Sequence, residues 1–429
     1  MTYWIGIIIS LAAGFLVIRR MAARLDPVLQ FFLALGLGLG IDGTCAFYVH
    51  ILFNQFNRFI PVGLVLASAV VLFFIKPFSM PRFKLTKQHA WGLLGLIVLA
   101  VPLAVSAHYY PLGGWDAWSC WNLKAKFIFL GHENWKDMLS PQFWRSNTQY
   151  PLLWPLINVW FWDLSGRFDQ AVPMLNSVVI ALLTAGVLLL GLMELTGQLA
   201  AGLLAVAVIM ALPIDITLYT SQYSDSLLGL YLLSAFLCLL LSEKCKEPKL
   251  KILSLIFLGL MSFAKDEGMV ASVIAALLIF WHQRKDKKNL KAFITAFCLA
   301  ALPTLLFKLF FAPKNEAFVN GLLSAQKPTT WPRLETIAVY PWFEFISAKW
   351  AGFWLLAAGG ILLAGKKLWC QALGVIGLTL ILYLGVVLAY YAVNTYFEIV
   401  WWLSTTLSRI LFALLPTIVL WIAAGLKDA

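Results

Sequence analysis

The chain has 429 residues, of which 62% are hydrophobic and 12% are charged, and its formal net charge is +12. A soluble protein of this length needs far more polar surface, so the composition excludes a soluble globular fold and indicates a polytopic membrane protein. Basic residues of membrane proteins collect in cytoplasmic loops, and this explains the positive charge better than binding to nucleic acid does.

The first apolar segment, residues 3–18, predicts a spanning helix that starts outside the cytoplasm. No basic residue precedes it, and Arg19, Arg20 and Arg24 follow it, which is the reverse of a secretory signal. Apolar segments of about 17–25 residues, with some shorter ones, predict the other spans. The expected total is thirteen, with the later spans at residues 27–50, 60–75, 90–107, 172–195, 200–217, 226–241, 252–263, 269–280, 292–311, 350–364, 368–392 and 410–425.

The basic residues predict which links face the cytoplasm. They cluster in residues 76–89, 242–251, 281–291 and 365–367, and Lys427 lies near the C-terminus. With thirteen spans, all of these positions fall on the cytoplasmic side, as the positive-inside rule requires. The N-terminus is then outside, the C-terminus is cytoplasmic, and the segment that follows span 90–107 is delivered to the outer side.

Residues 150–163 are strongly apolar but predict no span. They are short, contain Pro155 and three tryptophans, and a span here would move the lysine-rich links outside. We expect an interfacial or re-entrant helix at the outer membrane surface. The predicted organisation is an N-terminal region of three spans, residues 1–89, followed by a core, residues 90–429, with outer loops at about 107–171 and 312–349.

A few charged residues fall on the predicted outer side, where charges near the membrane are costly and tend to be functional. They are Asp116, Lys124, Lys126 and Glu133 in the first loop, Asp225, the Lys265–Asp266–Glu267 turn, and Arg409. Lys124 and Lys126 are two residues apart, so at most one of them is expected to face a pocket. Asp42 lies within a span and is expected to make a structural hydrogen bond to Thr44 or Tyr48.

Each of these candidates has a simpler explanation. Asp116 follows Gly113 and Gly114 and suits a turn or a helix cap. Asp225 suits a helix N-cap, and residues 265–267 suit a solvated hairpin with internal ion pairs. Arg409, at the expected outer end of the last span, opposes the positive-inside trend. It therefore predicts an anionic partner such as a phosphate, with a snorkelling side chain as the alternative.

A carboxylate, several cations and many aromatic residues at one membrane face suit glycosyl transfer from a polyprenyl-phosphate sugar. The carboxylate removes a proton from an acceptor hydroxyl, and the cations stabilise the departing phosphate. This reaction needs no cofactor, and the six cysteines and five histidines show no metal-ligand spacing.

The chain resembles the GT-C class of integral-membrane glycosyltransferases, in particular bacterial relatives of protein O-mannosyltransferase and of lipid A aminoarabinose transferase. The resemblance extends from about residue 90 to the C-terminus. It rests on five degenerate pieces in order: GGWDAWSCWNLKAKF (113–127), YPLLWP (150–155), SQYSDSLLGLYLL (221–233), AKDEG (264–268) and STTLSRILFALLP (404–416).

The resemblance implies an all-α GT-C-like bundle in a bacterial inner membrane, a polyprenyl-phosphate sugar donor, and a lipid, glycan or protein acceptor. It maps the catalytic base to Asp116 and the phosphate-binding role to Arg409, with Lys265 and Lys124 as further phosphate ligands. Supporting or substrate-binding residues are then Trp115, Trp118, Tyr150, Asp225, Asp266 and Glu267. The chain departs from the family pattern at Ala117, where many relatives carry a second acidic residue, and it has three spans before the core where relatives usually have one.

Two other functions remain open from the sequence. A transporter or flippase of lipid-linked sugars uses charges deep in the membrane and broken helices, whereas most charges here are predicted at the outer face. A non-catalytic membrane subunit with the same architecture binds polyprenyl phosphate without turnover.

Overall fold

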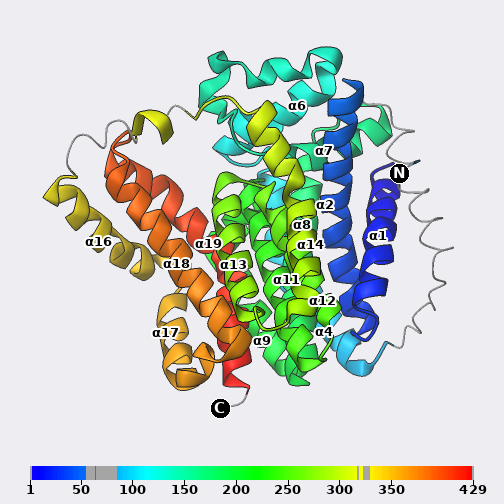
Figure 1. Ribbon diagram of the computed structural model, residues 1–429, viewed down its shortest axis with the longest axis vertical. Helices are drawn as coiled ribbons and strands as arrows, with labels where there is room; N and C mark the ends of the chain where they lie inside the picture. The colour runs from blue at the N-terminus through cyan, green and yellow to red at the C-terminus, as the bar shows by residue number, and fades with distance from the viewer. Residues whose placement is uncertain (1, 55–62, 64–84, 316–317, 322–328, 428–429) are drawn as a thin grey trace.

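The computed structural model describes residues 2–54, 63, 85–315, 318–321 and 329–427. The described residues form helices and connecting loops and contain no strand (Figure 1). The expected span 60–75 lies almost wholly outside them.

Eight helices in the described part of the chain are long and apolar enough to cross a membrane. They are α1 (Thr2–Met21), α2 (Pro27–Phe53), α4 with α5 (Lys87–Leu99 and Val101–Tyr109), α8 (Val172–Thr196), α11 (Ser224–Lys244), α14 (Lys287–Phe310), α18 (Gln371–Val393) and α19 (Ile399–Leu426). The pair α9 (Leu199–Met210) and α10 (Pro213–Thr220) makes a ninth candidate, bent by 72°. A multi-pass membrane protein is thus confirmed in outline, while the count of thirteen stays a prediction.

The other expected spans within the described residues are helical but short. They are α12 (Pro248–Ser262), α13 (Asp266–His282) and α17 (Phe353–Ala364). The short α12 packs between α11 and α14, and its residues from Phe257 to Ser262 are all buried. A helix enclosed by its neighbours does not need the full length that lipid contact demands.

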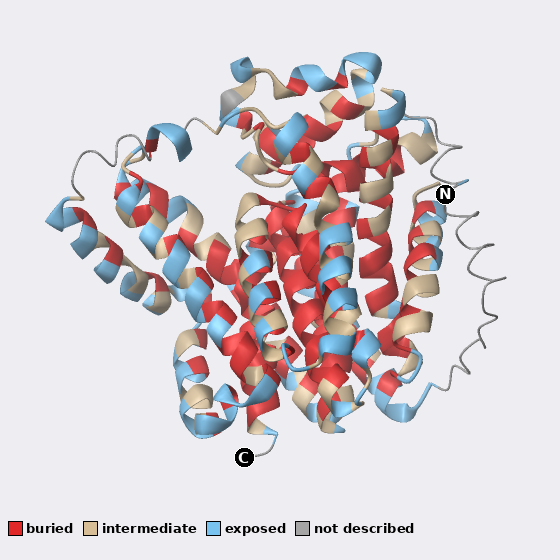
Figure 2. Cartoon of the chain, in the orientation of Figure 1, coloured by how far each residue is buried: buried red, intermediate tan, exposed pale blue. Residues whose placement is uncertain are grey.

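Helix α11 forms the centre of the bundle. Every residue from Ser224 to Ser242 is buried, and the helix packs against α12, α19 and α8. Its sequence is apolar on all sides, which is the pattern of a fully enclosed helix. Figure 2 shows the buried residues concentrated in these central helices and the exposed ones on the outer helices, such as α16 (Trp331–Ile346).

The segment between α5 and α8 covers one end of the bundle (Figure 1). It contains α6 (Asn122–Leu130), the short helical turns η2 (His132–Leu139) and η3 (Pro141–Ser146), and α7 (Leu153–Ser165). The helix expected at residues 150–163 is therefore present. Its residues from Leu153 to Trp162 are all buried, and it packs against α2, α6, α1 and α8. A helix of this length spans about 20 Å, which is too short to cross a bilayer.

Helices α1 and α2 cross at unusually close range through small residues. A Cβ atom on Gly38 would lie 1.7 Å from the carbonyl oxygen of Ser10, and one on Gly14 would lie 1.8 Å from that of Ala34. Small residues at a helix crossing let the two backbones approach, as is common in membrane bundles. The same crossing brings Ser10 to Asp42, to which its hydroxyl donates a hydrogen bond of 2.5 Å.

The predicted partner of Asp42 is therefore wrong. The expected bond was to Thr44 or Tyr48 in the same helix, but the carboxylate accepts from Ser10 in the neighbouring helix α1. Proximity in sequence suggested the local partners, whereas the close crossing of α1 and α2 supplies a nearer hydroxyl.

The crossing predicts different outcomes for two glycines of α2. Gly38→Ala should lower the unfolding temperature in detergent, because the added methyl group meets backbone that has no room to move. Gly36→Ala is the matched control, since its Cβ would lie 3.5 Å from the side chain of Leu230, an ordinary contact. Alanine is favoured over glycine in a helix by about 1 kcal/mol, so Gly36→Ala should leave stability unchanged or raise it. Equal unfolding temperatures for the two variants would contradict the close crossing.

Candidate functional site

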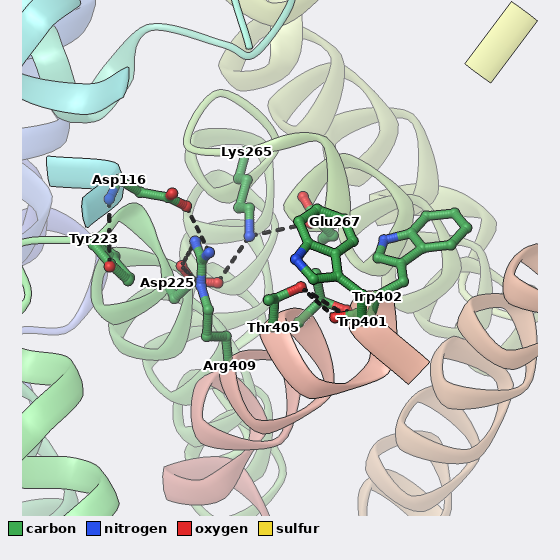
Figure 3. Close-up of polar contacts among 10 residues, drawn as sticks. Asp116, Tyr223, Asp225, Lys265, Glu267, Trp401, Trp402, Thr405 and Arg409 are labelled. Atoms are coloured by element: carbon green, nitrogen blue, oxygen red, sulfur yellow. Dashed lines mark hydrogen bonds and ion pairs between the residues drawn. The ribbon is translucent and has the colours of Figure 1, made fainter. Parts of the chain in front are cut away.

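Three distant segments of the chain meet at the guanidinium group of Arg409. Its Nη1 atom lies 2.6 Å from Oδ2 of Asp116, and its Nη2 atom lies 2.8 Å from Oδ2 of Asp225. Its Nε atom donates a second hydrogen bond, of 3.2 Å, to the same oxygen of Asp225. Figure 3 shows Arg409 between the two carboxylates. A guanidinium group presents several donors in a rigid fork, and here it joins two acidic residues from different elements.

The network continues from Asp225 to the turn between α12 and α13. The other oxygen of Asp225, Oδ1, accepts a hydrogen bond of 2.9 Å from Nζ of Lys265. Lys265 also pairs with Glu267 at 3.1 Å. The side chain of Asp225 is only 3% exposed and that of Lys265 only 5%, whereas the side chain of Asp116 is 27% exposed. Asp116 and Glu267, which is 24% exposed, are therefore the two members of this network that solvent reaches most.

These contacts decide between the alternatives for Asp116 and Asp225. Helix α11 has no side-chain hydrogen bond at its N-cap, so Asp225 is not a cap, and its carboxylate binds two cations instead. Asp116 makes no capping bond to the helical turn η1 (Ala117–Trp121) that follows it. The turn at Lys265 does contain the expected internal ion pair with Glu267, but Lys265 is buried and not solvated.

The charge of Lys265 depends on its carboxylate neighbours. Burial by itself disfavours an ammonium group, yet the attraction of Asp225 and Glu267 outweighs burial and raises the pKa of Lys265 above its usual value. Lys265 therefore stays charged at neutral pH, and the network contains two cations in a largely water-free environment.

Two glycines let the Asp116 loop lie directly on residues 221–223. Gly113 has φ of +74°, and a Cβ atom on Gly114 would lie 2.4 Å from the phenolic oxygen of Tyr223. The N–H group of Gly114 donates to the carbonyl of Ser221 at 3.1 Å, and the N–H group of Asp116 donates to the Tyr223 oxygen at 3.4 Å. The positive φ and the close approach both require glycine. The Gly-Gly-Trp-Asp sequence thus places Asp116 next to the start of α11.

Tyr223 and Lys308 belong to the site although the sequence did not single them out as candidates. The Tyr223 ring stacks on Arg409, with 4.5 Å from the guanidinium carbon to the ring centroid. Lys308, in α14, pairs with Asp266 at 2.5 Å and donates to the carbonyl of Gln149 at 2.7 Å. The sequence did contain a signal for each residue. Tyr223 lies in the quoted SQYSD motif, close to the candidate Asp225, and Lys308 is a charged residue within an expected apolar span.

Tyr150 lies between two lysines. The Nζ atom of Lys124 is 5.6 Å from its ring centroid, and that of Lys265 is 5.9 Å away. Lys124 is 1% exposed and donates to the carbonyl of Asn147 at 2.6 Å. Burial lowers the pKa of Lys124. Lys126, in contrast, lies over the ring of Phe168, so the two lysines point to different surroundings; that at most one of them faces a pocket stays a prediction.

The predicted tryptophans lie at the exposed edge of the site. Trp115 and Trp118 are 65% and 51% exposed and contact each other edge to face, with ring centroids 4.3 Å apart. Figure 3 shows another tryptophan, Trp401, on the side of Arg409 away from Asp116. Trp401 is 53% exposed and belongs to α19, the helix of Arg409. Exposed aromatic side chains therefore lie both in the Asp116 loop and in the helix of Arg409.

Two expectations about charge are changed by the structure. Arg409 is not at the end of its helix, because α19 begins ten residues earlier, at Ile399. Three of the four cations are also not free to receive a phosphate. Arg409, Lys265 and Lys308 are paired with carboxylates, and the cluster has as many acidic as basic residues: Asp116, Asp225, Asp266 and Glu267 against Lys124, Lys265, Lys308 and Arg409.

The lysine-rich links lie at the opposite end of the helices from this cluster. Helix α11 starts beside Asp225 and ends at Lys244, about 29 Å away at 1.5 Å per residue. At that far end, His282 pairs with Glu243 at 2.9 Å and Lys251 donates to Gln283 at 2.7 Å. The separation matches the thickness of the hydrocarbon layer of a bilayer, which is about 30 Å.

Two surface hollows lie away from the ion-pair network. One, of about 570 Å³, is polar and lies at the lysine-rich end beside Glu243 and His282. The other, of about 580 Å³, is apolar and lies between α2, α4, α5 and α8, with Phe32, Leu96 and Leu182 in its lining. Among the described residues, no group of three or more His, Cys, Asp or Glu side chains is arranged to hold a metal ion.

Comparisons of the chain with protein-family models, with curated proteins and with solved structures find no match. The family resemblance of the motifs therefore remains an expectation, and the function has to be argued from the site itself.

The ion-pair network predicts that Asp225 matters most for stability. Asp225→Asn should destabilise the folded protein by about 3–5 kcal/mol, because it leaves the buried Lys265 and the 14% exposed Arg409 without their shared buried carboxylate. Asp116→Asn removes a more exposed partner and should cost about 1 kcal/mol or less. Unfolding of both variants in detergent, followed by circular dichroism against denaturant, measures the difference. Equal destabilisation of the two would contradict the proposed central role of Asp225.

Proposed function

We propose that this protein is an inverting glycosyltransferase that moves a sugar from a polyprenyl-phosphate donor to an acceptor hydroxyl. One observation carries the proposal: a partly exposed carboxylate, Asp116, lies 2.6 Å from an arginine that is 14% exposed, at one end of an apolar helix bundle. The arrangement offers a proton acceptor and a phosphate ligand in contact with each other, near the depth of lipid headgroups. The positive-inside rule assigns this end to the extracytoplasmic side, because the lysine-rich links lie at the other end.

The proposed reaction is a direct displacement at the anomeric carbon. The acceptor oxygen forms a bond to that carbon while the bond from the carbon to the phosphate oxygen breaks, and the electron pair leaves with the phosphate. Asp116 takes the proton of the acceptor hydroxyl. Arg409 stabilises the charge that grows on the phosphate, which departs as polyprenyl phosphate. A single displacement inverts the configuration of the sugar.

The resting ion pair implies that donor binding changes the network. Asp116 occupies Nη1 of Arg409, so a phosphate that binds there takes the place of the carboxylate. Asp225 keeps its two bonds to Nε and Nη2, so the arginine holds its position during the exchange. The displaced carboxylate of Asp116 is then free to accept a proton. The exposed rings of Trp115 and Trp118 provide apolar faces against which a sugar packs.

A transport function is the second candidate, and one feature favours it. The α9–α10 pair is bent by 72°, and Asp215 in α10 is 1% exposed. Its carboxylate oxygens have no hydrogen-bond partner among the described residues. Broken helices and buried ionisable groups are typical of transporters. Transfer of radiolabelled sugar in detergent favours the enzyme, whereas movement of a lipid-linked sugar across proteoliposomes without transfer, lost in Asp215→Asn, favours transport.

Asp116→Asn should reduce sugar transfer by at least about 100-fold, the usual contribution of a general base. The measurement is transfer of radiolabelled sugar from the total polyprenyl-phosphate sugars of a bacterial membrane extract. Asp137→Asn is the matched control, because Asp137 is exposed in the same outer segment, in η2, and it should keep full activity. An active, folded Asp116→Asn variant would falsify the assignment of the base.

Exchange of Asp116 for phosphate on Arg409 predicts opposite changes in donor affinity. Asp116→Asn should bind farnesyl phosphate about fivefold more tightly, because the phosphate no longer competes with an ion pair worth about 1 kcal/mol. Arg409→Gln should bind it more weakly than the unmodified protein does. Titration by native mass spectrometry gives both affinities, with Asp137→Asn as reference. Weaker binding by Asp116→Asn would contradict the exchange.

A further inference from the structure

A line of hydrogen-bonded side chains runs through the bundle toward the loop of Asp116. The line connects helices α1, α8, α7 and α6 to Gln222. The side-chain amide of each Asn or Gln in it accepts one hydrogen bond and donates another. Tyr3 donates to Asn176 at 2.9 Å, Asn176 to Asn158 at 2.9 Å, Asn158 to Asn122 at 3.4 Å, and Asn122 to Gln222 at 2.8 Å. Buried amides aligned in this way polarise one another and specify a single arrangement.

Gln222 is the last residue of this line, and it contacts the backbone of the Asp116 loop. Its Oε1 atom accepts from Asn122, and its Nε2 atom donates to the carbonyl of Pro111 at 2.9 Å. The residue is 1% exposed and has φ of +59°, in the left-handed region that non-glycine residues rarely occupy. Such a conformation persists only where its surroundings hold it, and it is frequent at functional sites.

The residues on either side of Gln222 hold the same loop nearer to Asp116. Ser221 accepts from the N–H group of Gly114, and Tyr223 accepts from that of Asp116. Three successive residues thus contact the loop at Pro111, Gly114 and Asp116. Asp225, which binds Arg409, follows two residues after Tyr223. The loop that carries the carboxylate and the residue that holds its cation are therefore tied to one short segment.

We propose that Gln222 is a positioning residue that sets the carboxylate of Asp116 relative to Arg409, and that the asparagine line holds Gln222 in place. The proposal rests on the proposed function of Asp116 as the base. Both the oxygen and the nitrogen of the Gln222 amide make hydrogen bonds. A side chain of the same length without the N–H donor therefore cannot replace it. A displacement of about 1 Å at a reacting group costs about 100-fold in rate, so the effect falls on turnover.

Gln222→Glu tests the donor specifically. Burial raises the pKa of the introduced carboxyl group. Above that pKa the ionised group accepts from Asn122 but cannot donate to Pro111, so kcat should fall by about 100-fold with little change in KM. At lower pH the protonated carboxyl group regains a donor, and the ratio of variant to unmodified kcat should rise. A general loss of folding caused by a buried carboxylate would appear in a matched variant elsewhere in the bundle as well.

The matched control is Gln30→Glu. Gln30 is fully buried and its Nε2 atom donates to the carbonyl of Leu25 at 2.6 Å, at the other end of α1 from Tyr3. The control carries the same chemical change in an equally buried position, and it should keep its kcat. A Gln222→Glu variant whose kcat stays unchanged from neutral to alkaline pH overturns the proposal, and so does a loss that Gln30→Glu reproduces.

Hydrogen–deuterium exchange gives a second measurement that does not depend on activity. In Gln222→Met, peptides covering residues 111–118 should exchange faster than in the unmodified protein, while the lysine-rich link at 242–251 should be unchanged. If the unmodified protein transfers no sugar, the proposed function fails, and faster exchange still supports the positioning of the loop by Gln222. Unchanged exchange at 111–118 overturns it.

Discussion

The site depends on the buried carboxylate of Asp225. Its two oxygens bind two cations, Arg409 and Lys265, which come from α19 and from the link between α12 and α13. A buried charge is tolerable only when it is paired and hydrogen-bonded, so each of the three groups requires the others. The central helix α11, the last helix and the α12–α13 turn are thereby joined at one end of the bundle. Arg409 then extends the network to Asp116, the most exposed carboxylate bound to it.

The balance of charge limits what this cluster can do. An anionic donor does not meet an excess of positive charge, because each cation except Lys124 is paired with a carboxylate. In the proposed function, donor binding exchanges one anion for another at the Asp116–Arg409 pair, where Asp116 is 27% exposed. The exchange that binds the phosphate would then also release the proposed base. In the proposed mechanism, affinity for the donor and activation of the acceptor are thus coupled through one ion pair.

Local sequence was informative wherever a local requirement decides the structure. Apolar segments predicted the positions of the helices, since a backbone in lipid must satisfy its hydrogen bonds within each helix. Gly113 and Gly114 indicated a turn before Asp116, and the structure shows close contact with Tyr223 there. Helix lengths were less predictable. The short helix α12 lies inside the bundle, where neighbouring helices and not lipid surround it.

The sequence by itself determined a helical membrane protein with basic residues at one end of its helices and candidate acidic residues at the other. It could do so because hydrophobicity and charge act on each segment separately. Only the tertiary structure decided which charges meet. Asp225 pairs with Arg409 across 184 residues, and Asp42 bonds to Ser10 in place of its neighbours. The line of amides that ends at Gln222 links the Asp116 loop to α6, α7, α8 and α1. These contacts depend on how whole helices cross, and no short stretch of sequence contains that information.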